Sequence, residues 1–176
     1  MIFRETAIGG VVVVEPQAMA DERGLFARTW CADEFAANGV DPAVAQCSVS
    51  FNHRRHTLRG LHFQREPHGE SKLVRCTRGA VFDVAVDLRP ESPTYCRSVA
   101  VELTMDNRVA LFVPPGCAHG FLTLADDVEV LYQISPRFEP SAAAGVRWDD
   151  PRFGIEWPAA PAVISERDAT YPDFDG

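Results

Sequence analysis

Residues 72–88 read KLVRCTRGAVFDVAVDL, and this stretch decides how the rest of the chain is interpreted. Two runs rich in β-branched and apolar residues, 72–77 and 81–88, are separated by a short segment that contains Gly79. In the second run the apolar residues alternate with Asp83 and Asp87, so the two carboxylates are expected on the opposite face of a strand. Short strands joined by glycine turns are typical of a β-sandwich or β-barrel.

The same pattern extends along most of the chain. Strands are also predicted over 11–15, 25–30, 44–50, 57–64, 99–103, 109–113, 120–124 and 128–135. One short helix is predicted over 33–38, closed by Gly39. From residue 136, prolines and aromatic residues predict an irregular tail with a short turn at 165–168. No repeat or linker interrupts this pattern, so residues 1–176 are expected to form a single all-β domain.

Composition excludes several classes of protein. The chain has 176 residues, 46% of them hydrophobic and 24% charged, and a net charge of −8. It contains no run of about 20 apolar residues and no signal-peptide pattern, so neither a membrane span nor export is expected. The acidic balance argues against nucleic acid as a partner, although a nucleotide needs only a local positive pocket. The cysteines are odd in number and form no CxxC pair, which favours reduced thiols and a cytoplasmic location.

Lys72 is the only lysine among 17 basic residues. Its uniqueness is either chance or the mark of a site that needs a compact ammonium rather than a guanidinium. Strand alternation places His62 on one face with Gln64, and a barrel whose neighbouring strands offer Lys72 and Tyr132 would contain a polar pocket. Taken singly, His62 and Tyr132 are also compatible with ordinary core positions.

Residues 113–120, VPPGCAHG, have the form P-x-G-x-x-H. This resembles the second motif of the cupin superfamily, in which the histidine ligates a metal. The first cupin motif, H-x-H followed by a glutamate, corresponds here to His62, Gln64 and Lys72. An ammonium in the place of a ligating carboxylate repels a divalent cation, so we predict a barrel without metal or other cofactor.

Histidine, lysine and tyrosine together suit one chemistry that needs no metal. A neutral imidazole can remove a proton, and a buried ammonium can stabilise the enolate that forms next to a carbonyl. A tyrosine on the opposite side of the substrate can return a proton to the other face. These are the groups required for epimerisation α to a ketone.

Five segments together resemble the dTDP-4-dehydrorhamnose 3,5-epimerase family. They are TLRGLHFQ (57–64), KLV (72–74), VFDVAVDLR (81–89), PGCAHGF (115–121) and SERD (165–168). The resemblance implies a cupin-type jelly-roll barrel (a double-stranded β-helix), a homodimer and no cofactor. It also implies an isomerase that inverts C3, C5 or both in a nucleoside-diphosphate 4-keto-6-deoxyhexose.

The resemblance also assigns roles to residues. The proton acceptor falls on His62, its orienting carboxylate on Asp168, the enolate-stabilising group on Lys72 and the proton donor on Tyr132. The positions implied to bind substrate are Arg23, Phe26, Arg28, Gln46, Arg59, His119, Phe138 and Arg167. The segment with Arg23 and Phe26 is expected to reach the site of the partner subunit, and Asp83 is expected to hold His119.

Several nucleotide-recognition positions depart from the family pattern. Arg28 stands where the family often has a glutamate that contacts the base, and Phe138 stands for a tyrosine that stacks on thymine. Ser48 replaces an asparagine, and alanines 142 and 143 occupy the region of another glutamate. We therefore predict an altered nucleotide or sugar, while the nucleotide, the hexose and the number of inverted centres stay open.

Two other functions remain possible at this point. The chain could be a nucleotide-sugar binding protein without turnover, or a metal-dependent cupin enzyme. Asp168 could also cap a turn instead of serving His62, and Cys117 is interpreted as structural.

Overall fold

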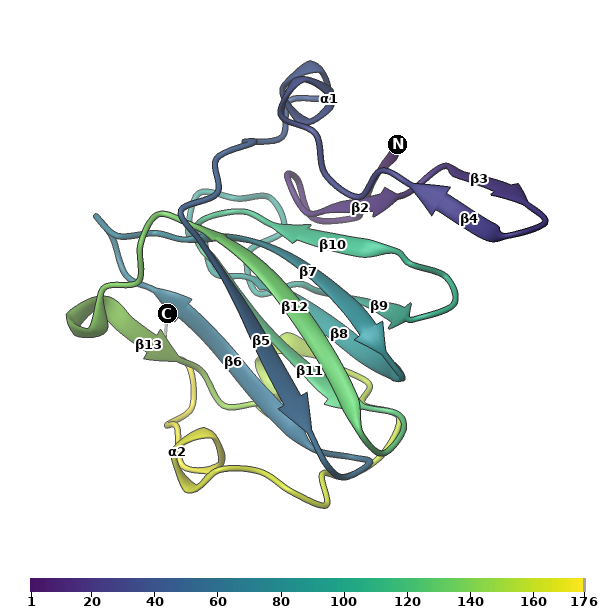
Figure 1. Ribbon diagram of the computed structural model, residues 1–176. Coiled ribbons are helices and arrows are strands. Elements are labelled where there is room, and N and C mark those ends of the chain that lie inside the picture. Colours follow the sequence, from purple (N-terminus) through teal and green to yellow (C-terminus); the bar gives the residue numbers. More distant parts are fainter. Residues whose placement is uncertain (176) are drawn as a thin grey trace.

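The computed structural model describes residues 1–175, which form two β-sheets packed face to face (Figure 1). The larger sheet contains, in spatial order, β1 (Ile2–Glu5), β2 (Val12–Glu15), β10 (Ala110–Val113), β7 (Ser71–Arg78), β12 (Val128–Ser135) and β5 (Gln46–Asn52). The smaller sheet contains β13 (Ala143–Gly145), β6 (Leu58–Gln64), β11 (Cys117–Thr123), β8 (Ala80–Asp87) and β9 (Ser98–Thr104). The chain changes sheet at every step from β5 to β8 and again from β10 to β13, which is the winding of a jelly roll.

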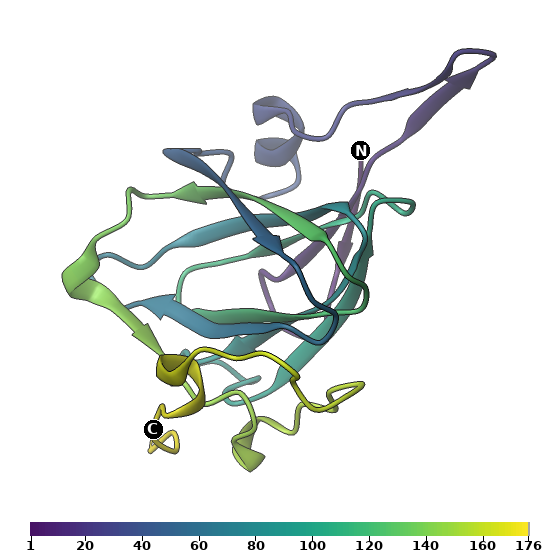
Figure 2. The same ribbon diagram turned by 60° about the horizontal axis from the view of Figure 1, so that its bottom comes forward.

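The remaining elements lie outside these sheets. Strands β3 (Ala18–Asp21) and β4 (Gly24–Ala27) form a hairpin that extends away from the two sheets (Figure 2). The helices are all short: α1 (Ala32–Ala37), α2 (Glu166–Ala169) and the 3₁₀ turns η1 (Pro140–Ala142) and η2 (Pro151–Phe153). Within residues 1–175 no helix has the length and apolar character needed to cross a membrane.

The predicted all-β jelly roll is confirmed, with local corrections. The strand predicted over 25–30 ends at Ala27, because its partner β3 begins at Ala18, opposite that residue. The next residue, Arg28, pairs with Glu34 of α1, with Nη1 2.9 Å from Oε1. Strands β1, β3 and β13 are found in addition to the predicted ones; each has four residues or fewer and lacks the continuous apolar run that marks the equally short β2 and β10. The predicted turn at 165–168 is the start of α2, with Ser165 as its N-cap.

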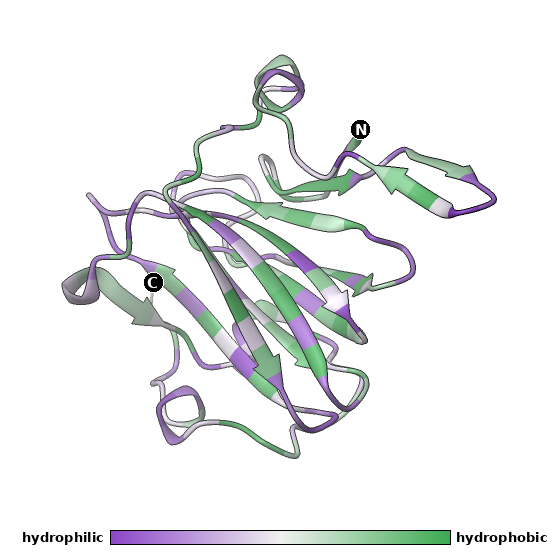
Figure 3. Ribbon diagram, in the orientation of Figure 1, coloured by the Kyte–Doolittle hydropathy of each residue, from purple (hydrophilic) through white to green (hydrophobic). Residues whose placement is uncertain are grey.

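Both faces of β8 are buried. Val84 and Val86 contact the C-terminal tail, including Phe153, whereas Val81 and Ala85 face the core between the sheets. Asp83 and Asp87 share the inner face with Val81 and Ala85 and are fully buried. Figure 3 shows the alternation of hydrophilic and hydrophobic residues along the neighbouring strands. The alternation predicted which face carries the carboxylates, but not that this face lies inside the barrel.

Apolar clusters also cover the outer faces of the sheets. On the larger sheet, Phe35 of α1 packs edge-on against Phe3, with ring centroids 5.2 Å apart. On the smaller sheet, the ring of Trp157 in the tail packs against the ring of Phe82, with centroids 5.8 Å apart. The tail from residue 146 onward is therefore packed on β8 over much of its length.

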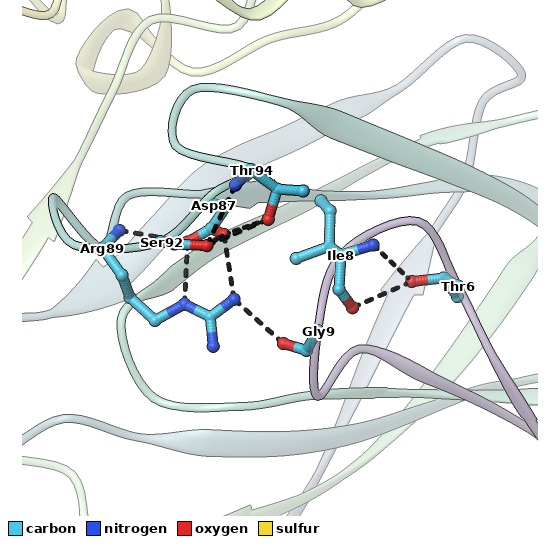
Figure 4. A network of polar contacts seen from close by, with 7 residues as sticks. All are labelled: Thr6, Ile8, Gly9, Asp87, Arg89, Ser92 and Thr94. Carbon is cyan, nitrogen blue, oxygen red and sulfur yellow. Dashed lines mark hydrogen bonds and ion pairs between the residues drawn. The ribbon is translucent and has the colours of Figure 1, made fainter.

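A network of polar contacts surrounds Asp87 at the end of β8 (Figure 4). Its Oδ1 accepts a hydrogen bond from Arg89 Nε at 2.7 Å, and its Oδ2 accepts from Ser92 Oγ and Thr94 Oγ1 at 2.5 and 2.7 Å. Arg89 Nη2 also donates to Gly9 O at 2.9 Å, which ties this loop to the turn before β2. Burial opposes ionisation of Asp87, but the hydrogen bonds outweigh it and hold its pKa well below the usual value.

Replacing Asp87 by alanine is expected to lower the free energy of unfolding by about 3–5 kcal/mol, because Arg89 and two hydroxyl groups lose their buried acceptor. Urea unfolding at pH 7 measures this loss. Asp149→Ala is the matched control: that carboxylate is exposed beside Arg147 and should contribute at most about 1 kcal/mol. Equal losses in the two variants would contradict the role given to the network.

The loss of stability in Asp87→Ala is expected to depend on pH. The lowered pKa of Asp87 means that its stabilising contribution is complete above about pH 4 and is lost as the pH falls below that value. The difference in stability between the wild type and Asp87→Ala should therefore narrow between pH 4 and pH 2.

Candidate active site

A pocket of about 330 Å³ opens between the two sheets. Its lining combines basic, aromatic and small polar side chains from both sheets and from the tail: Ser48, Val49, Ser50, Arg59, His62, Phe63, Glu70, Lys72, His119, Tyr132, Ile134, Phe138, Ala143, Ala144 and Arg167. Three of the four predicted catalytic residues are in this lining, and Asp168 lies directly behind His62.

The two histidines are placed by the pairing of β6 with β11. His62 and His119 are direct partners across the ladder, so their side chains share one face. Gly60 and Gly120 allow the close approach beside them: a Cβ on Gly60 would lie 2.6 Å from Gly120 Cα and 2.9 Å from His119 O. Gly60 also has φ +128°, which L side chains rarely adopt. Glycine is therefore required at this crossing.

Lys72 and Tyr132 come from the opposite sheet. In the pairing of β7 with β12, Lys72 is opposite Ile134 and Val74 is opposite Tyr132. Lysine and tyrosine thus share the inner face, two residues apart along the ladder, and face the pocket together with the histidines.

His62 and Asp168 form a hydrogen-bonded pair. His62 Nε2 lies 2.7 Å from Asp168 Oδ1, and Asp168 Oδ2 accepts a hydrogen bond from Gly60 N at 3.2 Å. Burial disfavours the charged carboxylate, but the hydrogen bonds, that from His62 foremost, outweigh it, so the pKa of Asp168 is lowered. An ionised carboxylate only accepts, so Nε2 carries the proton and Nδ1 is left as the basic nitrogen.

Asp168 is not the cap of its helix. Ser165 Oγ accepts from Asp168 N at 3.1 Å and caps α2, which leaves the Asp168 carboxylate for His62. The alternative interpretation of Asp168 as a capping residue is therefore wrong.

The Lys72 ammonium lies inside the pocket and not in solvent. Its side chain is 9% exposed, and Nζ donates to His62 O at 3.1 Å. Nζ also lies 2.8 Å from Glu70 Oε1, and that side chain is 8% exposed. Sequence reasoning missed Glu70; the only signal was a carboxylate two residues before the sole lysine.

Tyr132 faces a second buried histidine–carboxylate pair. His119 Nε2 is 2.9 Å from Asp83 Oδ1, as expected, and the ring of His119 lies edge-on to Tyr132 with centroids 5.9 Å apart. Asp83 Oδ2 has no hydrogen-bond partner within residues 1–175. Burial, and then the charge of Asp83, raise the pKa of Tyr132 well above its usual value, so its phenol is protonated and able to donate.

Of the predicted substrate-binding residues, five are at or next to the pocket. Arg59, His119, Phe138 and Arg167 line it, and Gln46 Oε1 accepts from Phe138 N at 3.0 Å. Arg59 Nε donates to Asn52 Oδ1 at 2.7 Å, and Asn52 is a second residue that sequence reasoning missed.

The other three lie outside this pocket. Arg23 pairs with Asp21 at the tip of the β3–β4 hairpin, and Phe26 on the same hairpin is 70% exposed. Arg28 pairs with Glu34 instead of facing the pocket of its own chain. The structure therefore does not bring these three residues together with the others.

Residues 1–175 contain no group of three or more His, Cys, Asp or Glu side chains placed to hold a metal ion. Cys117 is two residues before His119, which lines the pocket, but burial raises the pKa of the Cys117 thiol to about 12. A thiol in that state is a poor nucleophile, in keeping with a structural role.

Comparisons with known proteins identify the family of this chain. The family model described as dTDP-4-dehydrorhamnose 3,5-epimerase matches residues 5–176. A relative of that name from Sinorhizobium fredii is 42% identical over 99% of this chain and 90% of its own length.

Two solved structures extend the comparison. The dTDP-4-dehydrorhamnose 3,5-epimerase from Bacillus anthracis, with TDP and PPi bound, has a TM-score of 0.95 at 34% identity and covers 98% of this chain and 99% of its own. ChmJ, a 3′-monoepimerase from Streptomyces bikiniensis in complex with dTDP-quinovose, has a TM-score of 0.88 at 35% identity. The match covers 96% of this chain and 85% of ChmJ. This chain belongs to the dTDP-4-dehydrorhamnose 3,5-epimerase family.

Proposed function

We propose that this protein is an isomerase that inverts C3, C5 or both in a nucleoside-diphosphate 4-keto-6-deoxyhexose. The observation that carries the proposal is the His62–Asp168 pair, 2.7 Å apart, in a pocket that also holds Lys72 and Tyr132. A base, an oxyanion-stabilising cation and a protonated phenol thus converge on one space.

The first step is proton removal. His62 takes the proton from the carbon next to the ketone through its basic nitrogen, and Asp168 stabilises the imidazolium that results. The electron pair of the broken C–H bond moves into the carbon–carbon bond, and the carbonyl becomes an enolate. The ionised state of Asp168 favours this step, because the charge on His62 is balanced as it forms.

The enolate and its reprotonation involve the opposite sheet. The Lys72 ammonium supplies a positive charge for the enolate oxygen in a pocket that screens it poorly. Tyr132 then donates its proton to the carbon on the face opposite His62, and the carbonyl reforms. The proton on His62 and the phenolate of Tyr132 return to their starting states by exchange with solvent.

The charge of the pocket suits a nucleoside diphosphate. Arg59 and Arg167 both line it, and a diphosphate is recognised by such guanidinium groups. The named relatives act on or bind thymidine nucleotides, which supports this substrate class. We propose that the reaction needs no cofactor. We also propose a cytoplasmic location, in keeping with five free cysteines in the described chain.

We also propose a homodimer in which the β3–β4 hairpin reaches the pocket of the partner. Met19 and Phe26 on this hairpin are 69% and 70% exposed, and the hairpin extends away from its own sheets (Figure 2). Large apolar side chains presented in this way are typical of an interaction surface. Arg23 at the tip would add a cation to the partner's site.

Incubating the protein with a nucleoside-diphosphate 4-keto-6-deoxyhexose in deuterated water should place deuterium at C3 or C5, detected by NMR. His62→Ala should abolish this exchange. Asp168→Asn should slow it by about 10²–10⁴-fold, because the imidazolium loses its balancing charge. Glu166→Gln, on the same turn of α2 but away from His62, is the matched control and should exchange at the wild-type rate.

The same experiment separates the alternatives. Binding without exchange would support a nucleotide-sugar binding protein instead of an enzyme. Exchange that is lost on treatment with a chelator and restored by metal would support a metal-dependent enzyme.

The nucleotide is a separate prediction. Because Arg28 and Phe138 depart from the family pattern, we expect dTDP to bind more weakly than at least one of CDP, GDP and UDP, measured by calorimetry. Arg28→Glu should shift the preference toward dTDP by about 1–3 kcal/mol, since a carboxylate acceptor is restored. If the wild type binds dTDP at least as tightly as the other three, the altered specificity is wrong.

The dimer can be tested on the hairpin. Sedimentation should find two copies of the chain per particle, and Phe26→Ala should raise KM without lowering stability. Met105→Ala, at another exposed apolar position, should leave KM unchanged. A fully active monomer would contradict both the homodimer and the role of the hairpin in the partner's pocket.

A further inference from the structure

The environment of Lys72 contains a carboxylate for which the proton-transfer scheme has no use. Glu70 lies just before β7, lines the same pocket, and places Oε1 2.8 Å from Lys72 Nζ. Both side chains are nearly buried, at 8% and 9% exposed. Within residues 1–175, Lys72 is the only side chain that pairs with the Glu70 carboxylate.

A buried ammonium needs a countercharge, because an isolated charge in a poorly solvated site is strongly disfavoured. The backbone oxygen of His62, 3.1 Å from Nζ, supplies a hydrogen bond but no full charge. The other ionisable groups that line the pocket are His62, His119, Tyr132, Arg59 and Arg167. None of these is a resting anion, so Glu70 is the one acidic side chain of the lining.

The choice of lysine makes this countercharge important. Every other basic residue of the chain is an arginine, which stays charged in any protein environment. A lysine can lose its proton when buried, and a neutral amine could not stabilise an enolate.

We infer that Glu70 is the positioning residue for Lys72: it keeps the amine charged and aimed into the pocket, so that the enolate oxygen meets an ammonium. The inference rests on the epimerase function proposed above. The two contacts of Nζ, with Glu70 and with His62 O, fix the lysine from two sides and place it next to the strand that carries the base. As negative charge develops on the substrate oxygen, the ammonium shares its donors between Glu70 and the enolate.

The backbone next to Glu70 is held by contacts that do not involve this carboxylate. The next residue, Ser71, is paired with Ser135 in the ladder of β7 and β12, and its Oγ donates to Ser135 O at 3.2 Å. A Glu70→Gln variant keeps the shape of the side chain and one acceptor oxygen, and it removes the charge. The variant is therefore expected to fold.

The single lysine makes a direct test possible. Protein labelled with ¹⁵N at lysine Nζ gives one ammonium signal, that of Lys72, which NMR can follow as the pH is raised. In Glu70→Gln the ammonium signal should be lost at a pH lower by about one unit or more than in the wild type. Glu66→Gln, four residues earlier and directed at Gly69, is the matched control and should follow the wild type. An unchanged Lys72 signal in Glu70→Gln would overturn the inference.

Kinetics supply a second readout. Glu70→Gln should lower kcat by about tenfold or more with little change in KM, because the enolate exists only during the reaction. Glu70→Asp keeps the charge but shortens the reach, so it should retain the wild-type ammonium signal and still lose kcat. A rise in the KM of Glu70→Gln with an unchanged kcat would assign Glu70 to ground-state binding and contradict the positioning role.

The two readouts keep this inference separate from the proposed function. If the ammonium signal changes as expected but the wild type turns over no ketosugar, the epimerase function fails while the pairing stands. If the wild type is active and Glu70→Gln matches it in both signal and kcat, the inference about Glu70 fails alone.

Discussion

The chemistry proposed for this protein depends on one ammonium group, that of Lys72, which is buried between two β-sheets. The interior of a jelly roll is an apolar space, and most of it here is filled by valine, leucine and phenylalanine. Lys72 introduces a positive charge into that space. Each buried charge near it has a partner: Lys72 pairs with Glu70, and Asp168 pairs with His62. In the proposed mechanism this paired ammonium stabilises the enolate.

The winding of the chain explains how distant residues meet. Successive strands alternate between the sheets. His62 on β6 and Lys72 on β7, ten residues apart in sequence, therefore lie on opposite sheets and face one another across the barrel. The second turn of the winding repeats the arrangement with His119 on β11 and Tyr132 on β12. The two histidines therefore lie on one wall of the pocket, and Lys72 and Tyr132 lie on the opposite wall. Inversion of a stereocentre requires this two-sided geometry, because the proton leaves and returns on different faces.

Much of this could be predicted from the sequence, and the exceptions have physical causes. Period-two alternation identified the long strands and the faces of Asp83, His62 and Tyr132, because burial of one face leaves a clear pattern. It could not identify Glu70, which lies outside the strands, where no period indicates direction. The partner of His62 is 106 residues away, and only the family motif pointed to Asp168. The ion pair of Arg28 with Glu34 could not be predicted either, because α1 is short and its first turn gives no sign of a partner six residues earlier.

The C-terminal tail connects stability with catalysis. Its apolar residues Phe153, Trp157 and Phe174 cover the outer face of the smaller sheet, and the same tail continues to α2, which carries Asp168. The isolated bridge of Val163 to Thr57 and the hydrogen bond from Leu58 N to Val163 O fix the tail against β6 shortly before that helix. The position of the carboxylate behind His62 thus depends on how the tail packs on both sides of α2. A tail that looks irregular in sequence is ordered here because its aromatic residues have a sheet to cover, and this order brings the orienting carboxylate to the base.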